Sequence, residues 1–317
     1  MMLDSPSEEL SAFFLVGPTA AGKTDIAHRI ALTQNFAVLS ADSMLVYKQM
    51  DIGTAKPTPE QRHAVQYFGI DLVTPDLPFS AGQYRSYALS VLQQLASRNQ
   101  ECIVTGGTGL YIKSLTDGLE DAFGVQPEIR ETVKLLYREK GTDGILAILK
   151  ERYPQIYEEL QDKDNPRRVM RAMEIAMSGK TLPRSWKKIP RAQMVGLFMP
   201  SAELARRIEK RVHTMFSRGL LDEVSSLLKQ YGKLSETAIQ AIGYKEAIDV
   251  LNGKINVKTA EELVIKRTKQ LAKRQMTWFR HQADVKWINA SEETDPDKLA
   301  QKVTELWRLY GKTKVAR

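Results

Sequence analysis

The sequence predicts an α/β protein in which helices flank a parallel sheet and a separate all-helical domain is inserted. Short apolar runs of strand length alternate with longer stretches of helical periodicity, as in strands joined by crossover helices. Between residues 127 and 190 the pattern is instead helical and highly charged, with no strand-like run. We therefore expect a first core segment at residues 1–118, an inserted helical domain at 119–192 and a return to the core at 193–317.

The first apolar run ends in a phosphate-binding loop. The spacing Gly17-x-x-x-x-Gly22-Lys23-Thr24 matches the Walker A pattern, with a strand-like run before it and a helical stretch, residues 25–32, after it. Glycines let backbone N–H groups surround phosphate oxygens, and the helix N-terminus adds positive potential there. We therefore expect a P-loop NTPase-like core, with Lys23 neutralising the terminal phosphate and Thr24 holding Mg²⁺. The expected diphosphate or nucleotide contacts are Gly17, Pro18, Thr19, Ala20, Ala21, Gly22, Lys23 and Thr24. A glycine-rich turn without a ligand is the alternative.

Composition limits the classes of protein that fit. The chain has 317 residues, 26% charged and 43% hydrophobic, which is typical of globular proteins. No apolar stretch approaches the roughly 18 residues that span a membrane, and the acidic, polar N-terminus is unlike a secretory signal. The single cysteine, Cys102, excludes an internal disulfide, so we expect a cytoplasmic protein with Cys102 in its core. A net charge of +8 makes nucleic acid a candidate partner.

The second strand-like run, residues 35–43, contains Asp42 near its end. Ligands bind at the carboxyl ends of strands in open parallel sheets, so we expect Asp42 beside the P-loop. A helix cap or a local turn is the alternative, because Asp is favoured at both. Residues 42–57, which mix apolar and polar side chains, are expected to face the substrate.

The next elements complete the first core segment. Residues 58–80 contain three prolines and are expected to form a loop around a short strand at 67–72. A helix follows at 81–97, with apolar residues at helical spacing. The strand at 101–105 leads into Gly106-Gly107-Thr108, which would bring backbone and a hydroxyl close to a ligand.

In the inserted domain, Pro166 suits a helix start, and Arg167, Arg168 and Arg171 fall within about one turn. A binding surface and an ordinary solvated face both fit this pattern. A core strand is expected to return at residues 193–200. The helix after it would carry two arginines on one face, Arg207 and Arg211, and a helical pair would follow near residues 235–252.

Residues 257–280 have the clearest helical pattern. At 100° per residue, the expected apolar stripe consists of Ala260, Val264, Leu271 and Trp278. The opposite face would carry the four cations that we call the basic stripe: Lys266, Lys269, Lys273 and Arg280. No acid interrupts the basic stripe, which favours a polyanion groove, and ordinary solvation is the alternative. A strand at 285–289 and a helix at 296–310 complete the expected core.

Four separated segments give the chain an end-to-end resemblance to the bacterial-type tRNA dimethylallyltransferases, also called tRNA isopentenyl transferases. They are residues 17–24, 42–57 (DSMLVYKQMDIGTAKP), 106–113 (GGTGLYIK) and 267–280 (RTKQLAKRQMTWFR). Enzymes of this family move a dimethylallyl group from its diphosphate to N6 of the adenine 3′ to the anticodon, releasing diphosphate. The resemblance implies a prenyltransferase that acts as a cytoplasmic monomer on the anticodon stem-loop of tRNA, with dimethylallyl diphosphate as donor and Mg²⁺ as cofactor.

The resemblance also assigns roles to residues. Asp42 would take the proton of the amine, and Thr108 would help to place the amine or the base. Arg207 and Arg211 would contact the diphosphate. The implied tRNA contacts are Ser43, Met44, Leu45, Arg130, Pro166, Arg167, Arg168, Val169, Met170, Gln240, Ala241, Ile242, Gly243, Tyr244, Lys245, Lys273, Arg274, Gln275, Met276, Thr277, Trp278, Phe279 and Arg280.

Two other functions fit the motifs. One is a P-loop kinase of a nucleotide or small metabolite, with Asp42 as base and Arg167, Arg168 and Arg171 as a lid over ATP. The basic stripe argues against it. The other is a non-catalytic RNA-binding module whose nucleotide site is a switch, against which Asp42 and Thr108 together argue.

Overall fold

The computed structural model describes residues 9–118, 125–182 and 192–316. The N-terminal segment, where we expected no export signal, and the residues around both expected domain boundaries lie outside these ranges. The chain divides into two compact units, a core of residues 1–118 and 191–317 and an insert of residues 119–190. No helix of the described residues is both long and apolar enough to cross a bilayer.

The core unit alternates strands with helices. Its strands are β1 (Ser11–Val16), β2 (Ala37–Ser40), β3 (Tyr67–Phe68), β4 (Cys102–Gly106), β5 (Gln193–Phe198), β6 (Asp284–Asn289) and β7 (Thr313–Lys314). Its helices are α1 (Lys23–Gln34), α2 (Pro59–Ala64), α3 (Ala81–Ala96), α4 (Gly109–Thr116), α8 (Ser201–Ser217), α9 (Leu220–Tyr231), the 3₁₀-helix η2 (Ala238–Gln240), α10 (Tyr244–Leu251), α11 (Val257–Gln282) and α12 (Pro296–Tyr310).

The sheet has the strand order β3-β2-β4-β1-β5-β6, and all neighbours in this order are parallel. The short β7 pairs antiparallel with the start of β1. In the register, Val16 of β1 lies opposite Gly106 of β4, and Ser40 of β2 lies opposite Thr105. The carboxyl ends of β1, β4 and β2 therefore lie together, which confirms the expected fold class.

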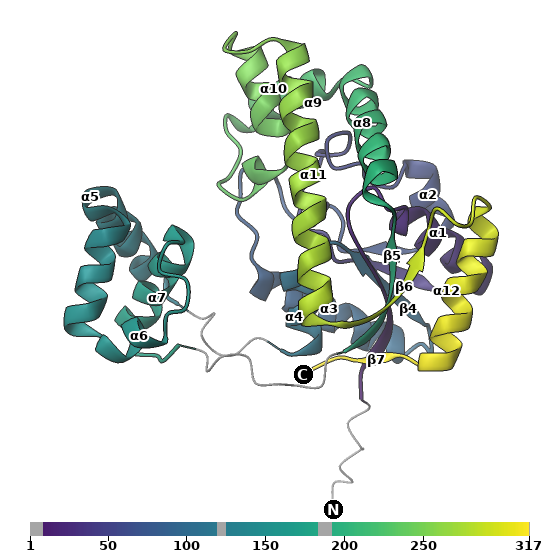
Figure 1. The fold of residues 1–317 in the computed structure, drawn as a ribbon, viewed down its shortest axis with the longest axis horizontal. Coiled ribbons are helices and arrows are strands. Elements are labelled where there is room, and N and C mark those ends of the chain that lie inside the picture. The colour runs from purple at the N-terminus through teal and green to yellow at the C-terminus, as the bar shows by residue number, and fades with distance from the viewer. Residues whose placement is uncertain (1–8, 119–124, 183–191, 317) are drawn as a thin grey trace, which may run out of the picture. The chain divides into compact units, whose positions relative to one another are not determined.

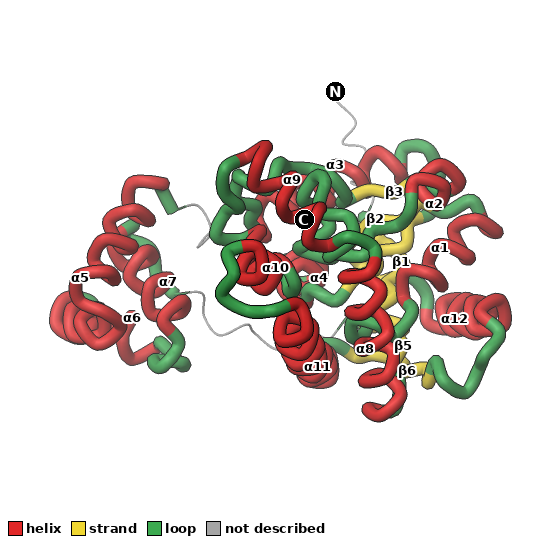
Figure 2. The backbone as a smooth tube through the Cα atoms, turned by 90° about the horizontal axis from the view of Figure 1, so that it is seen from above, coloured by secondary structure: helices red, strands yellow, loops and turns green. Residues whose placement is uncertain are grey.

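Helices cover both faces of the sheet, and alternate residues of β1 face each layer. Phe14 and Val16 belong to a hydrophobic cluster with side chains of α3, α4, α9 and α10. Leu15 belongs to the opposite cluster, with α1, α8 and α12. Figures 1 and 2 show α1 and α12 lying side by side on that second face. Cys102 is buried in the first cluster, as expected.

In residues 125–182, the described part of the inserted unit, all regular structure is helical, as the fold prediction stated. It contains α5 (Pro127–Arg152), α6 (Pro154–Glu159) and α7 (Pro166–Met177), with Asn165 capping the last. Gly141, at φ 65°, kinks α5. The unit has its own hydrophobic core, formed by Val133, Ile145, Leu149, Val169 and Ile175 among others.

Three short elements differ from the sequence expectations. Residues 58–80 contain helix α2, whose start is a capping box formed by Thr58 and Gln61. The glycine-rich segment after β4 continues directly into α4. The third strand, expected over 67–72, is only two residues long, Tyr67–Phe68. These differences leave the sheet order unchanged.

Helix α11 forms as expected, but the expected apolar stripe is wrong in its second half. The buried residues of the helix are Ala260, Val264, Thr268, Ala272 and Phe279, whereas Leu271 and Trp278 are only half-buried. The packing partners of the helix change from α8 and α10 to α4 and β6. The buried face therefore shifts by one residue along the helix.

Close approach at the end of β4 holds β2 in place. The N–H of Ala41 donates to the carbonyl of Thr105 at 2.7 Å. A Cβ on Gly106 would lie 2.2 Å from the carbonyl oxygen of Ala41. Only glycine fits at this position without moving the backbone that leads to Asp42.

Gly106→Ala is expected to lower the free energy of unfolding by about 1–3 kcal/mol, the usual cost of overpacking. Urea denaturation measures this change. Gly82→Ala is the matched control, because the nearest atom to a Cβ there is the Ser80 hydroxyl at 3.9 Å. The control should be neutral or stabilising by up to about 1 kcal/mol. Equal stability of the two variants would contradict the close approach.

Candidate active site

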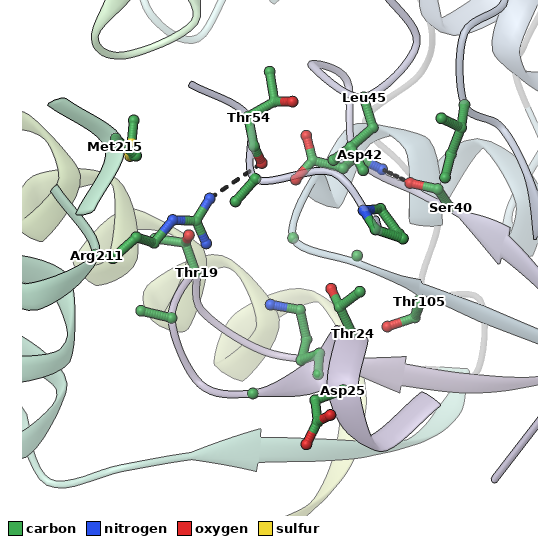
Figure 3. Close-up of a pocket in the computed structure, with 18 of the residues that line it drawn as sticks. Thr19, Thr24, Asp25, Ser40, Asp42, Leu45, Thr54, Thr105, Arg211 and Met215 are labelled. Carbon is green, nitrogen blue, oxygen red and sulfur yellow. Dashed lines mark hydrogen bonds between the residues drawn. The ribbon is translucent and has the colours of Figure 1, made fainter. Parts of the chain in front are cut away.

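Three loops meet at the carboxyl ends of neighbouring strands. The P-loop follows β1, the turn containing Asp42 follows β2, and Gly106-Gly107-Thr108 closes β4. They surround a cavity of about 500 Å³ whose lining includes P-loop residues, Asp42, Gly106 and side chains of α8 (Figure 3). The cavity also includes Leu45, Ile52, Thr54, Ala55 and Pro57, so part of the segment 42–57 faces it, while Val46, Tyr47 and Met50 of that segment are buried in the hydrophobic core. The topology thus brings the predicted catalytic and diphosphate residues of the core to one place.

Lys23 begins helix α1 at the base of the cavity and is buried. Its Nζ donates to the carbonyl of Pro18 at 2.7 Å, inside the P-loop. Burial lowers the pKa of Lys23 to about 8, while the Asp42 carboxylate acts to raise it and Arg211 to lower it. Burial disfavours the charged ammonium. An anion in the loop would restore the charge.

Asp42 has one carboxylate oxygen in a local turn, as the alternative interpretation expected. Its Oδ1 accepts from the N–H of Met44 at 2.9 Å, and its own N–H donates to the Ser40 hydroxyl at 3.3 Å. Figure 3 shows the carboxylate on the side of Asp42 that faces Thr54, opposite to the side on which Ser40 lies. No described residue forms a hydrogen bond with Oδ2. The turn and a chemical role are therefore compatible, because they use different oxygens.

Thr108 braces the Asp42 turn and is not among the residues that line the cavity. Its hydroxyl accepts from the N–H of Ser43 at 3.0 Å and donates to the Ser43 hydroxyl at 3.3 Å. The N–H of Thr108 donates to the carbonyl of Ala41 at 3.2 Å. Of the two roles considered for Thr108, these contacts favour placement of the base.

Helix α8 supplies a cationic wall. Arg211 donates to the carbonyl of Thr54 at 3.1 Å, a bond drawn in Figure 3, and burial lowers the pKa of its guanidinium. Arg207 lines the cavity and lies 3.9 Å from Glu203. Lys210 and Arg218 also line the cavity but were not predicted. The sequence could have predicted them, because Lys210 is spaced three residues from Arg207 and Arg218 two helical turns from Arg211, which places them on the same side of the helical segment.

The rest of the wall is apolar. Val38, Leu45, Ile52, Ile70 and Met215 contribute to the cavity from four separate segments. Apolar surface therefore lies beside a cationic P-loop site. This combination suits a ligand with a diphosphate at one end and hydrocarbon at the other.

The predicted tRNA contacts divide into exposed and buried side chains. In the core unit, Gln240, Lys245, Lys273, Arg274, Thr277 and Arg280 are exposed, whereas Ser43, Met44, Ile242, Met276 and Trp278 are half-buried. Leu45, Ala241, Gly243, Tyr244 and Phe279 are buried. The side chains of Ala241, Tyr244 and Phe279 are packed inside the protein, so we do not expect direct side-chain contact with tRNA there, whereas Leu45 lies at the cavity. A role of these segments in tRNA binding stays a prediction.

Gln275 also requires a correction. Its Oε1 accepts from the N–H of Thr19 in the P-loop at 2.8 Å, and its Nε2 donates to the carbonyl of Gly107 at 3.1 Å. Both ends of the side chain are therefore engaged inside the protein. Gln275 joins the P-loop to the β4 turn and lines the cavity.

The basic stripe is less uniform than expected. Lys266, Lys273 and Arg280 are exposed, but Lys269 is paired with Glu209 of α8 at 2.6 Å. The neutralising acid comes from another helix, so the sequence of α11 alone did not reveal it. Lys269 is thus a weak candidate for phosphate binding.

In the inserted unit, Arg130, Pro166 and Arg167 are exposed and Met170 is half-buried. Arg168 lies 3.3 Å from Asp162, and Val169 is in the core of the unit. Direct contact of the Val169 side chain with tRNA is therefore corrected as well. The exposed members remain predictions.

Thr24 is the candidate metal ligand. It is exposed and lines the cavity next to Lys23. In the described part of the chain, no group of three or more His, Cys, Asp or Glu side chains is arranged to hold a metal ion. A cation here would therefore depend on the Thr24 hydroxyl together with oxygens of the bound anion, a donor set that fits Mg²⁺.

The pKa of Lys23 predicts a pH dependence for anion binding. Above pH 8 the free protein holds a largely neutral Lys23, and a bound diphosphate favours the ammonium, so binding takes up a proton. The affinity for inorganic diphosphate should fall by up to about tenfold per pH unit above pH 8 through this one group. Calorimetry in buffers of different ionisation enthalpy measures the uptake. The proton uptake measured with Lys23→Met is subtracted from that of the wild type, which removes the contribution of the diphosphate's own titration. Identical proton uptake by the wild type and Lys23→Met would contradict the prediction.

The chain is similar to known proteins along most of its length. A family model described as IPP transferase matches residues 45–282. A tRNA dimethylallyltransferase of Acetivibrio thermocellus is 37% identical over 305 residues, which are 94% of this chain and 97% of that protein.

Solved structures give the same result. The full-length tRNA isopentenylpyrophosphate transferase of Bacillus halodurans has a TM-score of 0.69 and 31% identity, covering 94% of this chain and 95% of that one. A eukaryotic dimethylallyltransferase acting on tRNA has a TM-score of 0.72, covering 93% of this chain and 77% of that one, and at 22% identity it supports the fold alone. From the match over most of the chain, together with the cavity where the P-loop and Asp42 meet, we conclude that this chain belongs to the IPP transferase family.

Proposed function

We propose that the chain transfers a dimethylallyl group from dimethylallyl diphosphate to the exocyclic N6 of the adenine 3′ to the anticodon of tRNA. The observation that carries this proposal is the single cavity in which the P-loop, Asp42 and an apolar wall meet. The apolar side chains beside the phosphate-binding loop suit the short hydrocarbon chain of a prenyl diphosphate.

The residues divide the reaction between them. Lys23, Arg207 and Arg211 would neutralise the diphosphate as the bond between its oxygen and the allylic carbon breaks. The new bond forms between that carbon and N6, and Asp42 takes the proton that N6 loses. The lone pair of N6 is delocalised into the ring, so a base matters for this nucleophile. Thr108 would keep Asp42 in position through Ser43.

Mg²⁺ fits as the cofactor. The Thr24 hydroxyl and the diphosphate oxygens would hold it, and it would supply charge stabilisation of the departing diphosphate. The reacting adenine must leave its stack to reach Asp42, and contacts to the RNA backbone would offset that cost of a few kcal/mol. Lys273, Arg274 and Arg280 are exposed cations on α11 that suit this role. Action as a cytoplasmic monomer on the anticodon stem-loop is part of the same proposal.

The kinase alternative is not favoured. Its lid would need Arg167, Arg168 and Arg171, but Arg168 lies 3.3 Å from Asp162 and Arg171 donates to Glu174 at 2.7 Å. Both pairings lie inside the inserted unit. A kinase would also produce ADP from ATP in the absence of RNA, which a prenyltransferase does not.

Asp42→Asn tests the base. Asn accepts the same hydrogen bond from Met44, so the turn is kept while proton acceptance is lost. We expect single-turnover transfer at saturating donor to fall by roughly 10²- to 10⁴-fold, the usual contribution of a general base. The affinity for tRNA should change far less. A variant with more than about a third of the wild-type rate would remove Asp42 from the chemistry.

Lys273→Gln tests the α11 surface. The log–log slope of tRNA affinity against salt should flatten by about 0.7–0.9, the value for one phosphate contact. Lys269→Gln should change the slope less, because Lys269 is paired with Glu209. Lys298→Gln on α12 serves as a control of equal charge change. An unaltered slope for Lys273→Gln would mean that this part of the basic stripe is an ordinary solvated face.

A further inference from the structure

Glu223 of α9 holds the backbone of a cavity segment. Its Oε2 accepts from the N–H groups of Asp51 at 2.9 Å and Ile52 at 2.6 Å, and its Oε1 accepts from that of Gly53 at 3.3 Å. The hydroxyl of Tyr244 donates to Oε1 at 2.6 Å. One carboxylate therefore receives four hydrogen bonds, three of them from consecutive residues that lie about 170 positions away in the chain.

Three consecutive N–H groups that point to one place form an anion-binding concavity. Here the anion is the protein's own carboxylate, and hydrogen bonds to a charged acceptor are the stronger kind. The segment needs such an anchor because Ala55 has a φ of 52°, an unfavourable conformation for a residue with a side chain. Farther along the segment, Arg211 donates to the carbonyl of Thr54 and the buried Lys56 pairs with Asp51.

The segment that Glu223 holds forms part of the cavity wall. Ile52, Thr54 and Ala55 line the cavity, whereas Glu223 does not. Ile52 therefore lies between two N–H groups fixed by Glu223, with its side chain at the cavity. A shift of the backbone at residues 51–53 would change the apolar wall without moving the P-loop.

We propose that Glu223 is a positioning residue for the prenyl donor, holding residues 51–53 so that Ile52 and its neighbours form the wall for the hydrocarbon end. This inference rests on the proposed function. In this arrangement different residues recognise the two ends of the donor. The P-loop binds the diphosphate, and Glu223 acts only on the wall for the prenyl group.

Glu223→Gln tests the proposal. The amide keeps the shape of the side chain but offers one acceptor oxygen in place of two. Its NH₂ group would face N–H or O–H donors and could not accept a hydrogen bond from them. We expect the dissociation constant of dimethylallyl diphosphate to rise roughly tenfold, as for loss of hydrogen bonds to a charged group, with that of inorganic diphosphate unchanged. In transfer assays the KM for the donor should rise while kcat stays within about twofold, the pattern for lost ground-state binding.

Two further variants keep the test decisive. Tyr244→Phe retains the carboxylate and removes one hydrogen-bond donor to it. The dissociation constant of dimethylallyl diphosphate, divided by that of inorganic diphosphate, should therefore rise by only about threefold. Asp222→Asn removes an exposed charge next to Glu223 on α9 and should behave as wild type. If thermal unfolding shows that Glu223→Gln does not fold, the dissociation constants measured with Tyr244→Phe decide whether the inference holds.

The outcomes distinguish this inference from the proposed function. Unchanged donor binding in folded Glu223→Gln overturns the inference, and so does an equal loss for donor and inorganic diphosphate, which would indicate general damage to the site. If wild-type protein binds the donor but does not modify tRNA, the proposed function fails while the comparison of dissociation constants still judges Glu223. If wild-type protein does not bind dimethylallyl diphosphate, both fail.

Discussion

The parallel pairing of β4 between β1 and β2 is the constraint on which the site depends. It sets Val16 opposite Gly106 and Thr105 opposite Ser40, so that the three strands end at the same level and the loops that follow them begin side by side. The P-loop, the Asp42 turn and the β4 turn come from distant parts of the sequence, and only this register makes them neighbours. The absence of a Cβ at Gly106 allows the closest of these approaches.

Charge inside the cavity follows from that geometry. Two cations, the buried Lys23 and the half-buried Arg211, lie close enough to Asp42 for its carboxylate to raise the pKa of each. Burial without an anion is unfavourable for both cations and lowers both pKa values. A site with this excess of buried positive charge is prepared for a multiply charged anion, whose binding relieves the cost of the arrangement.

Side chains from the C-terminal half connect the loops that the sheet assembles. Gln275 of α11 joins the P-loop to the β4 turn, and Glu223 of α9 holds the segment after the Asp42 turn. Residues far along the chain from the P-loop and Asp42 thus shape the cavity without carrying the chemistry. Tyr244, expected at a tRNA surface, is buried and donates to Glu223, and Phe279 is buried in the hydrophobic cluster on the same face of the sheet.

From the sequence alone we could predict the fold class, the P-loop, the placement of Asp42 beside it and the helical nature of the insert. Each depends on local signals, namely residue spacing, strand-length apolar runs and helical periodicity. The partners of Gln275, Glu223 and Lys269 came only from the tertiary structure. The sequence does not show which of many polar side chains will pair with a given one, and contact between residues 60 to 256 positions apart leaves no periodic trace. The phase of a 26-residue helix is likewise decided by packing, because its neighbours change along its length.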